Sequence, residues 1–336
     1  MNSAVIGCGY WGRHLIRNFY TSKNWTLKYI CDIKQSSSEQ LAQLYPGVIA
    51  ESDYEAILAD GSIDAIIIAT PVSTHFELAK KALLACKHVW LEKPMTSSSA
   101  EAEELCKLAE SKGVLLHVDH TFIYTPAVRK IKEIIDSKEL GDILYFDSVR
   151  VNLGLFQHDV NVIWDLAPHD ISIWEFCVGK QPVSVHAIGS MPYKYSDKDI
   201  ESIAYLTVKF EDGTIAHFHS NWLSPVKIRQ IILGGSKKML IFNDMEPMEK
   251  LKIYDTGVDI KTNEDVYETL VQYRTGDMHS PAIKNYEALS TECEHFYESI
   301  MAGKPTDTDG YAGLYVVKIL EAASESLRTG QTINLQ

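Results

Sequence analysis

The chain has 336 residues, of which 46% are hydrophobic and 23% charged, with a formal net charge of −13. This is the composition of an ordinary globular protein, long enough for two domains with separate cores. The negative charge disfavours nonspecific attraction to nucleic acid or to an anionic membrane surface, so we expect neither as a partner. An anionic ligand would need a local cationic pocket.

The six cysteines show no paired metal-binding spacing, so we expect reduced thiols and no metal site. The chain begins with a strand pattern rather than a basic and then apolar leader. No apolar run approaches the length that spans a membrane. The expected compartment is therefore the cytoplasm.

A short apolar strand at residues 4–6 runs into three glycines and then into an amphipathic helix. In a dinucleotide-binding unit, Gly7 would make the tight turn, Gly9 would let the backbone approach a pyrophosphate, and Gly12 would let helix and strand pack closely. The helix N-terminus would supply N–H donors to the phosphates. We expect this loop, including Tyr10 and Trp11, to contact the cofactor.

The second strand, residues 27–31, ends on Asp32, twenty residues past Gly12. A carboxylate there would accept hydrogen bonds from the ribose hydroxyls and repel a 2′-phosphate, which predicts NAD over NADP. Lys34 nearby argues the other way. The structural alternative is a turn aspartate after a strand.

Strands and helices alternate over the first 122 residues, with further strands at 63–69, 88–91 and 114–118. This order predicts an α/β fold whose first domain, residues 1–122, is a doubly wound parallel Rossmann sheet. Ligands bind such sheets at the carboxyl ends of the strands. The additional residues expected at the cofactor there are Thr70, Pro71, His75, Glu92 and Lys93.

Residues 123–336 predict a second α/β domain, because after one helix the pattern becomes alternating strands and turns typical of antiparallel sheet. The expected strands are 143–152, 183–188, 203–210, 214–219, 228–233, 238–242 and 251–254, with hairpin links at 211–213 and 234–236. Helices are expected near 166–177, 282–301 and 310–327. The segment 257–278 has no clear periodicity.

Lys93 is the first catalytic candidate. A lysine at the end of a parallel strand, between Glu92 and Pro94, would point to where a nicotinamide lies and could polarise a substrate oxygen. The alternative is a surface lysine in a turn, which is the commoner fate of lysines.

Asp165 and His169 form the second candidate. At i and i+4 on a helix they share a face, so the carboxylate could orient an imidazole that exchanges a proton with an alcohol. Pro168 complicates this interpretation, because proline fits best in the first turn and Asp165 could then be the helix cap. The alternative is a capping aspartate and a satisfied buried histidine.

Together, the glycine fingerprint, Glu92-Lys93-Pro94 and the Asp165/His169 pair resemble the Gfo/Idh/MocA oxidoreductase family over essentially the whole chain. The resemblance implies tightly bound NAD or NADP, a second domain with a large, mostly antiparallel open sheet, and hydride transfer at a sugar or cyclitol hydroxyl. It also implies that Lys93, Asp165 and His169 are the catalytic residues. By the same resemblance we expect a homodimer or homotetramer.

Two features bear on the substrate pocket. Many family members have paired glycines shortly before the aspartate, whereas residues 161–164 here are Asn-Val-Ile-Trp. By position, the further pocket contacts expected beside His169 are Tyr124, Arg150, Asn152 and Asn161. Tyr124, Asn152 and Asn161 could equally be satisfied structural polar groups.

Residues 150–154 and 159–169 look most like family members associated with amino-sugar nucleotides. Arg150, Lys227 and Arg229 place cations on expected strands, where they could neutralise a diphosphate. The alternative is that they occupy solvent-facing positions of a sheet. The hypothesis is therefore a UDP-linked amino sugar as substrate, with inositol or a free aldose as the alternative. A nonenzymatic regulator that senses cofactor or sugar is the competing class of function.

Overall fold

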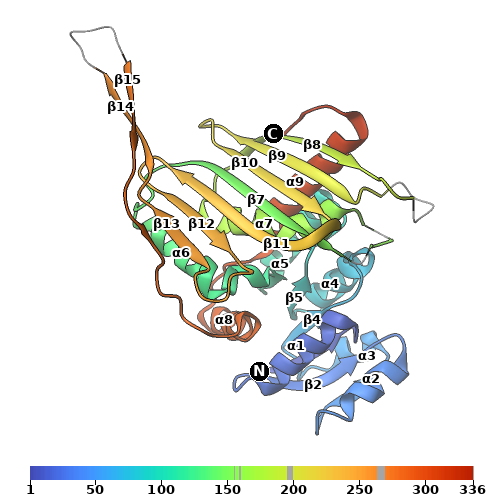
Figure 1. The fold of residues 1–336 in the computed structure, drawn as a ribbon. Coiled ribbons are helices and arrows are strands. Elements are labelled where there is room, and N and C mark those ends of the chain that lie inside the picture. The colour runs from blue at the N-terminus through green and yellow to red at the C-terminus, as the bar shows by residue number, and fades with distance from the viewer. Residues whose placement is uncertain (155, 159, 195–199, 263–268, 336) are drawn as a thin grey trace. The chain divides into compact units, whose positions relative to one another are not determined.

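The structure is a computed structural model, which describes residues 1–154, 156–158, 160–194, 200–262 and 269–335 (Figure 1). Asp159, part of a stretch used for the substrate hypothesis, lies outside the described residues. The chain forms two compact units. The first unit contains residues 1–125 and 286–318, and the second contains 126–285 and 319–336. The chain therefore returns to its first unit near the C-terminus, which differs from the single boundary at 122/123 that we expected.

The first unit is built on a six-stranded parallel sheet in the order β3-β2-β1-β4-β5-β6. Its strands are β1 (Asn2–Ile6), β2 (Thr26–Cys31), β3 (Ile49–Glu51), β4 (Ala65–Ile68), β5 (His88–Glu92) and β6 (Leu116–Asp119). This confirms the doubly wound Rossmann sheet. The strand order reverses between β1 and β4, and at such a point a crevice forms outside the carboxyl ends of the strands.

The helices of this unit follow its strands in alternation, as expected. They are α1 (Tyr10–Thr21), α2 (Gln35–Ala42), α3 (Tyr54–Ala59), α4 (His75–Leu84) and α5 (Ser99–Lys112), with 3-10 turns η1 (Val72–Thr74) and η2 (Thr121–Tyr124). The later helix α8 (Ala288–Ala302) joins them. Its Phe296 packs on Trp25 and Trp90 in the core of the unit, and the Trp25 indole donates a hydrogen bond to the Cys293 carbonyl.

The second unit contains a nine-stranded sheet in the order β16-β13-β12-β11-β7-β10-β9-β8-β17. All of its strand pairs are antiparallel except β7 with β10, which confirms the large, mostly antiparallel sheet. Its strands are β7 (Ile143–Leu153), β8 (Pro182–Ser190), β9 (Ile203–Phe210), β10 (Ile215–Asn221), β11 (Leu223–Gly235), β12 (Met239–Asn243), β13 (Leu251–Tyr254), β16 (Met278–His279) and β17 (Ile333–Asn334). The two expected hairpins join β9 to β10 and β11 to β12.

Three helices belong wholly or partly to the second unit. They are α6 (Pro126–Asp136), α7 (Val162–Cys177) and α9 (Gly310–Thr329), the last of which spans the 318/319 junction. Alternate residues of β9 and β10, such as Leu206 and Phe218, are buried on the face that α7 contacts. The segment without periodicity forms a separate hairpin, β14 (Gly257–Thr262) and β15 (Thr269–Arg274), which projects beyond the large sheet (Figure 1).

The cysteine and membrane expectations can be compared with the described residues. The six cysteines are free thiols, of which Cys86 alone is exposed. Within the described ranges, no helix has the length and apolar character needed to cross a membrane.

Three buried histidines of the first unit, His75, His117 and His120, have lowered pKa values, chiefly because burial penalises the charged imidazolium. For His120 burial, assisted by the Lys93 ammonium, lowers the pKa to about 3. Neither His120 ring nitrogen has a hydrogen-bond partner among the described residues. The unfolded chain therefore binds more protons than the folded chain below about pH 6.5.

This difference predicts acid sensitivity with a definite sign. Stability from neutral His120 is fully present above about pH 6.5 and is lost as the pH falls toward 3, at about 1.4 kcal/mol for each pH unit. Between pH 7 and pH 5, the free energy of unfolding of the wild type should fall by about 2 kcal/mol more than that of His120→Phe. Urea unfolding of both proteins at the two pH values measures this, and equal pH dependence would contradict it.

Candidate functional site

The glycine loop between β1 and α1 has the geometry of a phosphate-binding turn. Gly7 has φ +103°, and a Cβ there would lie 2.5 Å from the Ala69 carbonyl oxygen. A Cβ on Gly12 would lie 2.1 Å from the Gly7 carbonyl oxygen, so helix and turn touch through their backbones. Gly9 precedes α1 as its N-cap, and a Cβ there would meet no atom within 4 Å. The loop is thus tight where it packs and open where a ligand would approach.

Asp32 is fixed against this loop by two backbone amides. Its Oδ2 accepts from the Cys8 N–H at 2.8 Å, and its Oδ1 accepts from the Lys34 N–H at 2.9 Å. The carboxylate remains half-buried at the end of β2. Lys34 therefore orients Asp32 through its backbone, and the acid keeps the position that a ribose hydroxyl would require.

A cavity of about 520 Å³ lies beside the loop. The expected residues that line it are Gly7, Gly9, Asp32, Thr70 and Pro71, and they come from the ends of β1, β2 and β4. Ile33, which the sequence analysis did not select, also lines it and is 99% exposed. An exposed apolar side chain next to Asp32, the acid expected at the ribose, suits the flat face of an adenine.

His75 lies behind this cavity rather than in it. Its side chain is 1% exposed, with Nδ1 2.9 Å from the Pro94 carbonyl oxygen and Nε2 2.8 Å from the Thr70 carbonyl oxygen. The expectation that His75 contacts the cofactor directly is therefore corrected. The ring instead links the loop after β4 to the turn that carries Lys93.

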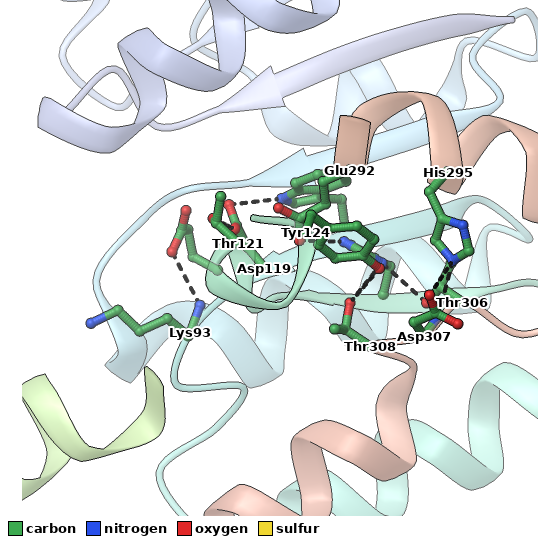
Figure 2. A network of polar contacts seen from close by, with 12 residues as sticks. Lys93, Asp119, Thr121, Tyr124, Glu292, His295, Thr306, Asp307 and Thr308 are labelled. Carbon is green, nitrogen blue, oxygen red and sulfur yellow. Dashed lines mark hydrogen bonds and ion pairs between the residues drawn. The ribbon is translucent and has the colours of Figure 1, made fainter. Parts of the chain in front are cut away.

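Lys93 follows β5, as expected, and its side chain is half-buried. Its backbone N–H donates to Glu92 Oε2 at 3.1 Å, and its side chain extends away from Asp119, Thr121 and Tyr124 (Figure 2). The Glu92 carboxyl is hydrogen-bonded to Asp119 on the neighbouring strand. Burial, and then Asp119, raise the pKa of Glu92 well above its usual value.

In the second unit, Asp165 and His169 lie on one helix, α7, at i and i+4. Asn161 is the N-cap and its side chain accepts from the Trp164 N–H, so Asp165 falls within the first turn. Asp165 Oδ2 accepts a hydrogen bond from the Trp222 indole at 2.9 Å. Asp165 and His169 are each half-buried, so the pair shares a face one turn apart with the carboxylate fixed from outside the helix.

The expected helix start was wrong. We expected α7 to begin near 166, with Pro168 in its first turn and Asp165 as a possible cap, but the helix begins at Val162 and contains Pro168 in its interior. The Asn161 cap allows the earlier start. Proline removes one N–H from the helical ladder, and the helix tolerates that loss here.

The cations proposed for a diphosphate have different environments. Arg150 is 4% exposed and makes a bidentate ion pair with Asp170 of α7, at 2.9 and 2.6 Å, so the solvent-facing alternative is wrong for this residue. Arg229 pairs with Asp244 at 3.4 Å. Lys227 lies exposed on β11.

The three polar residues expected to contact the substrate also differ in their environments. Tyr124 is fully buried, with its hydroxyl 3.2 Å from Thr308 Oγ1, which is what the structural alternative predicts. Asn161 caps α7 and donates to Glu201 Oε2 at 3.0 Å, so its amide is also used within the fold. Asn152 is half-buried near the end of β7.

Comparison with known proteins agrees with this geometry. Residues 1–120 match a family model described as "Oxidoreductase family, NAD-binding Rossmann fold", and residues 128–241 match the "GFO/IDH/MocA C-terminal domain". The chain belongs to the Gfo/Idh/MocA oxidoreductase family. It is accordingly an NAD(P)-dependent dehydrogenase acting on CH–OH groups, with an NAD-binding Rossmann domain.

Three proteins similar to this Gfo/Idh/MocA chain show the kinds of enzyme found among its relatives. UDP-N-acetylglucosamine 3-dehydrogenase from Acidithiobacillus ferrooxidans is 27% identical over 94% of each chain, and its structure has a TM-score of 0.80 over 97% of each. The scyllo-inositol 2-dehydrogenase (NAD(+)) of Bacillus subtilis is 27% identical over 99% of this chain and 95% of its own. GenD2 from gentamicin A biosynthesis, solved with NAD, shares the fold at a TM-score of 0.84 and 19% identity, over 100% of this chain and 96% of its own.

Sequence reasoning missed the partners of the site residues. Trp222, between β10 and β11, is 57 residues from the Asp165 that it holds, and Asp119 is 27 residues from Glu92. No local sequence pattern predicts the contact of Trp222 with Asp165 or that of Asp119 with Glu92. An aspartate ending a buried strand was the available signal for Asp119, because that is where ligand-side residues of a parallel sheet lie.

The geometry of Asp32 predicts cofactor preference. NAD should bind more tightly than NADP, because the fixed carboxylate repels a 2′-phosphate. Asp32→Ser should lower the ratio of NAD affinity to NADP affinity by about tenfold or more, since it removes that charge. Titration of wild type and variant with both dinucleotides measures the ratio, and a wild type that binds NADP tenfold more tightly would contradict the assignment.

Proposed function

We propose that this oxidoreductase oxidises a ring hydroxyl of a nucleotide-linked sugar, a UDP-N-acetylated hexose, to a keto-sugar with NAD. The observation that carries the proposal is similarity to the UDP-N-acetylglucosamine 3-dehydrogenase over 94% of both chains. The exposed cation Lys227 supports it, because a diphosphate needs local positive charge in a protein of net charge −13. The buried Arg150 pair with Asp170 contributes no such free charge.

An inositol is the second candidate substrate. The scyllo-inositol dehydrogenase relative is equally similar, at 27% identity over 99% of this chain. An inositol would need no diphosphate site, so Lys227 distinguishes the two proposals.

The chemistry assigned to the residues is the same for both substrates. The glycine loop and Asp32 would hold NAD, which supplies the hydride acceptor. His169 takes the proton of the hydroxyl whose carbon is oxidised, since an imidazole exchanges protons near neutral pH. Asp165, held by Trp222, orients that imidazole and stabilises its charged form. The role that the family resemblance gives Lys93 is to bind a substrate oxygen and to offset negative charge that develops on it.

Removing the base tests this assignment. His169→Ala should lower kcat by roughly 10²-fold or more while NAD affinity stays unchanged, because a general base contributes on that scale. Steady-state turnover and NAD titration measure the two effects. Normal turnover by the variant would refute the acid–base assignment.

Trp222→Phe is a milder variant that tests the same assignment. It keeps His169 and removes one hydrogen bond to Asp165, so we expect a smaller loss of kcat, about five- to tenfold. A kcat equal to that of the wild type would show that the Asp165 contact has no part in turnover.

The substrate is tested by comparing kcat/KM for a UDP-N-acetylhexose, the matching free sugar and inositol. The proposal expects the nucleotide sugar to be preferred, and Lys227→Ala to lower kcat/KM for it but not for the free sugar, since the lysine acts on the diphosphate. A free polyol preferred over every nucleotide sugar tested would overturn the substrate and leave hydride transfer intact.

We further propose that two copies associate through the face of the nine-stranded sheet opposite the helix-covered side. Tyr205, Ile215 and Ile228 on that face are 39%, 41% and 36% exposed, and apolar side chains at such positions are available for contact with a second copy. Sedimentation of wild type should give a dimer or tetramer, and Ile215→Arg should shift it toward monomer. Met248→Arg, at an 86% exposed loop position, is the matched control. A monomeric wild type would refute this surface.

A further inference from the structure

Trp11 connects the glycine loop to a distant strand end. It lies in the first turn of α1, and its indole N–H donates to Asp119 Oδ2 at 3.0 Å, across 108 residues of sequence. The indole is 36% exposed, so one part of it is held and another part is open.

Asp119 accepts hydrogen bonds from several donors. Besides Trp11, it accepts from the indole of Trp90 at 3.3 Å and from the Thr121 hydroxyl (Figure 2), and it is 2% exposed. The Glu92 carboxyl is hydrogen-bonded to it as well. Several hydrogen-bond donors therefore converge on this one buried carboxyl group, which fixes its position. Asp119 is therefore a fixed, buried acceptor to which the Trp11 indole is hydrogen-bonded.

The order of strands in the sheet indicates which half of a bound dinucleotide the Trp11 indole and Asp119 would face. Asp32 follows β2 and Asp119 ends β6, on opposite sides of β1. The cavity beside Asp32 is lined by the ends of β1, β2 and β4, and Trp11 is not among its lining residues. The Trp11 indole is thus turned from the adenosine side toward the side of the sheet that carries Lys93.

We infer that Asp119 is a positioning residue for the cofactor: it holds the Trp11 indole in one orientation, against which the pyrophosphate and nicotinamide half of NAD packs. An aromatic ring fixed at a helix N-terminus offers a rigid wall beside the phosphate-binding amides. The inference rests on the dinucleotide site and is independent of the substrate, so it is tested by binding alone.

The experiment measures dissociation constants of the full-length protein for NAD and for 5′-AMP without substrate. Trp11→Phe keeps the ring and removes the N–H donor, so NAD affinity should fall about five- to tenfold, the scale of one hydrogen bond, while 5′-AMP affinity stays unchanged. Trp90→Phe is the matched control, because it removes the other indole donor to Asp119 from a fully buried ring. It should lower stability and leave both affinities unchanged.

Asp119→Leu, which removes the acceptor, should weaken NAD as Trp11→Phe does, and the double variant should lose no more than either single variant. Unchanged NAD affinity in Trp11→Phe, or equal loss for NAD and 5′-AMP, would overturn the inference even if Asp119→Leu fails to fold. A wild type that binds 5′-AMP but not NAD would also overturn it.

Discussion

The contact between the backbones of Gly7 and Gly12 is the constraint on which the dinucleotide site depends. With 2.1 Å between a hypothetical Gly12 Cβ and the Gly7 carbonyl oxygen, no side chain fits between turn and helix. This approach directs the first N–H groups of α1 to the loop, where an anion binds. Asp32 is fixed to the same loop through the Cys8 N–H. The backbone expected at the phosphates and the carboxylate expected at the ribose are therefore held together as one rigid piece.

Buried polar groups extend from that loop through the first unit. His117 lies between Glu292 of α8 and the hydroxyls of Thr306 and Thr308, at 3.1 to 3.2 Å. Such groups are costly to bury and stabilise the fold only when their hydrogen bonds are made. The returning segment 286–318 supplies these partners, so the first unit of this family member includes buried residues from near the other end of its sequence.

The second unit also contains buried polar groups that satisfy one another, in this case as an ion pair. Arg150 and Asp170 neutralise each other between β7 and α7, and breaking such a pair by removing one partner costs about 3–5 kcal/mol. The pair helps fix the helix that carries Asp165 and His169. Pro168 is tolerated within that helix because Asn161 caps it upstream. The proposed acid–base pair thus stands on a helix secured at its cap and by a buried ion pair.

Local sequence determined the alternation of strands and helices in the first unit, the glycine turn, the strand-end positions of Asp32 and Lys93, and the i, i+4 spacing of Asp165 and His169. These features depend on periodicity, backbone freedom and chain position, which neighbouring residues encode. Tertiary structure alone decided that Tyr124 and His75 are buried, that Arg150 pairs with Asp170, and that Asp119 and Trp222 hold Trp11 and Asp165. Those assignments depend on which side chains meet across tens or hundreds of residues, and solvent exposure and hydrogen-bond partners exist only once the chain has folded.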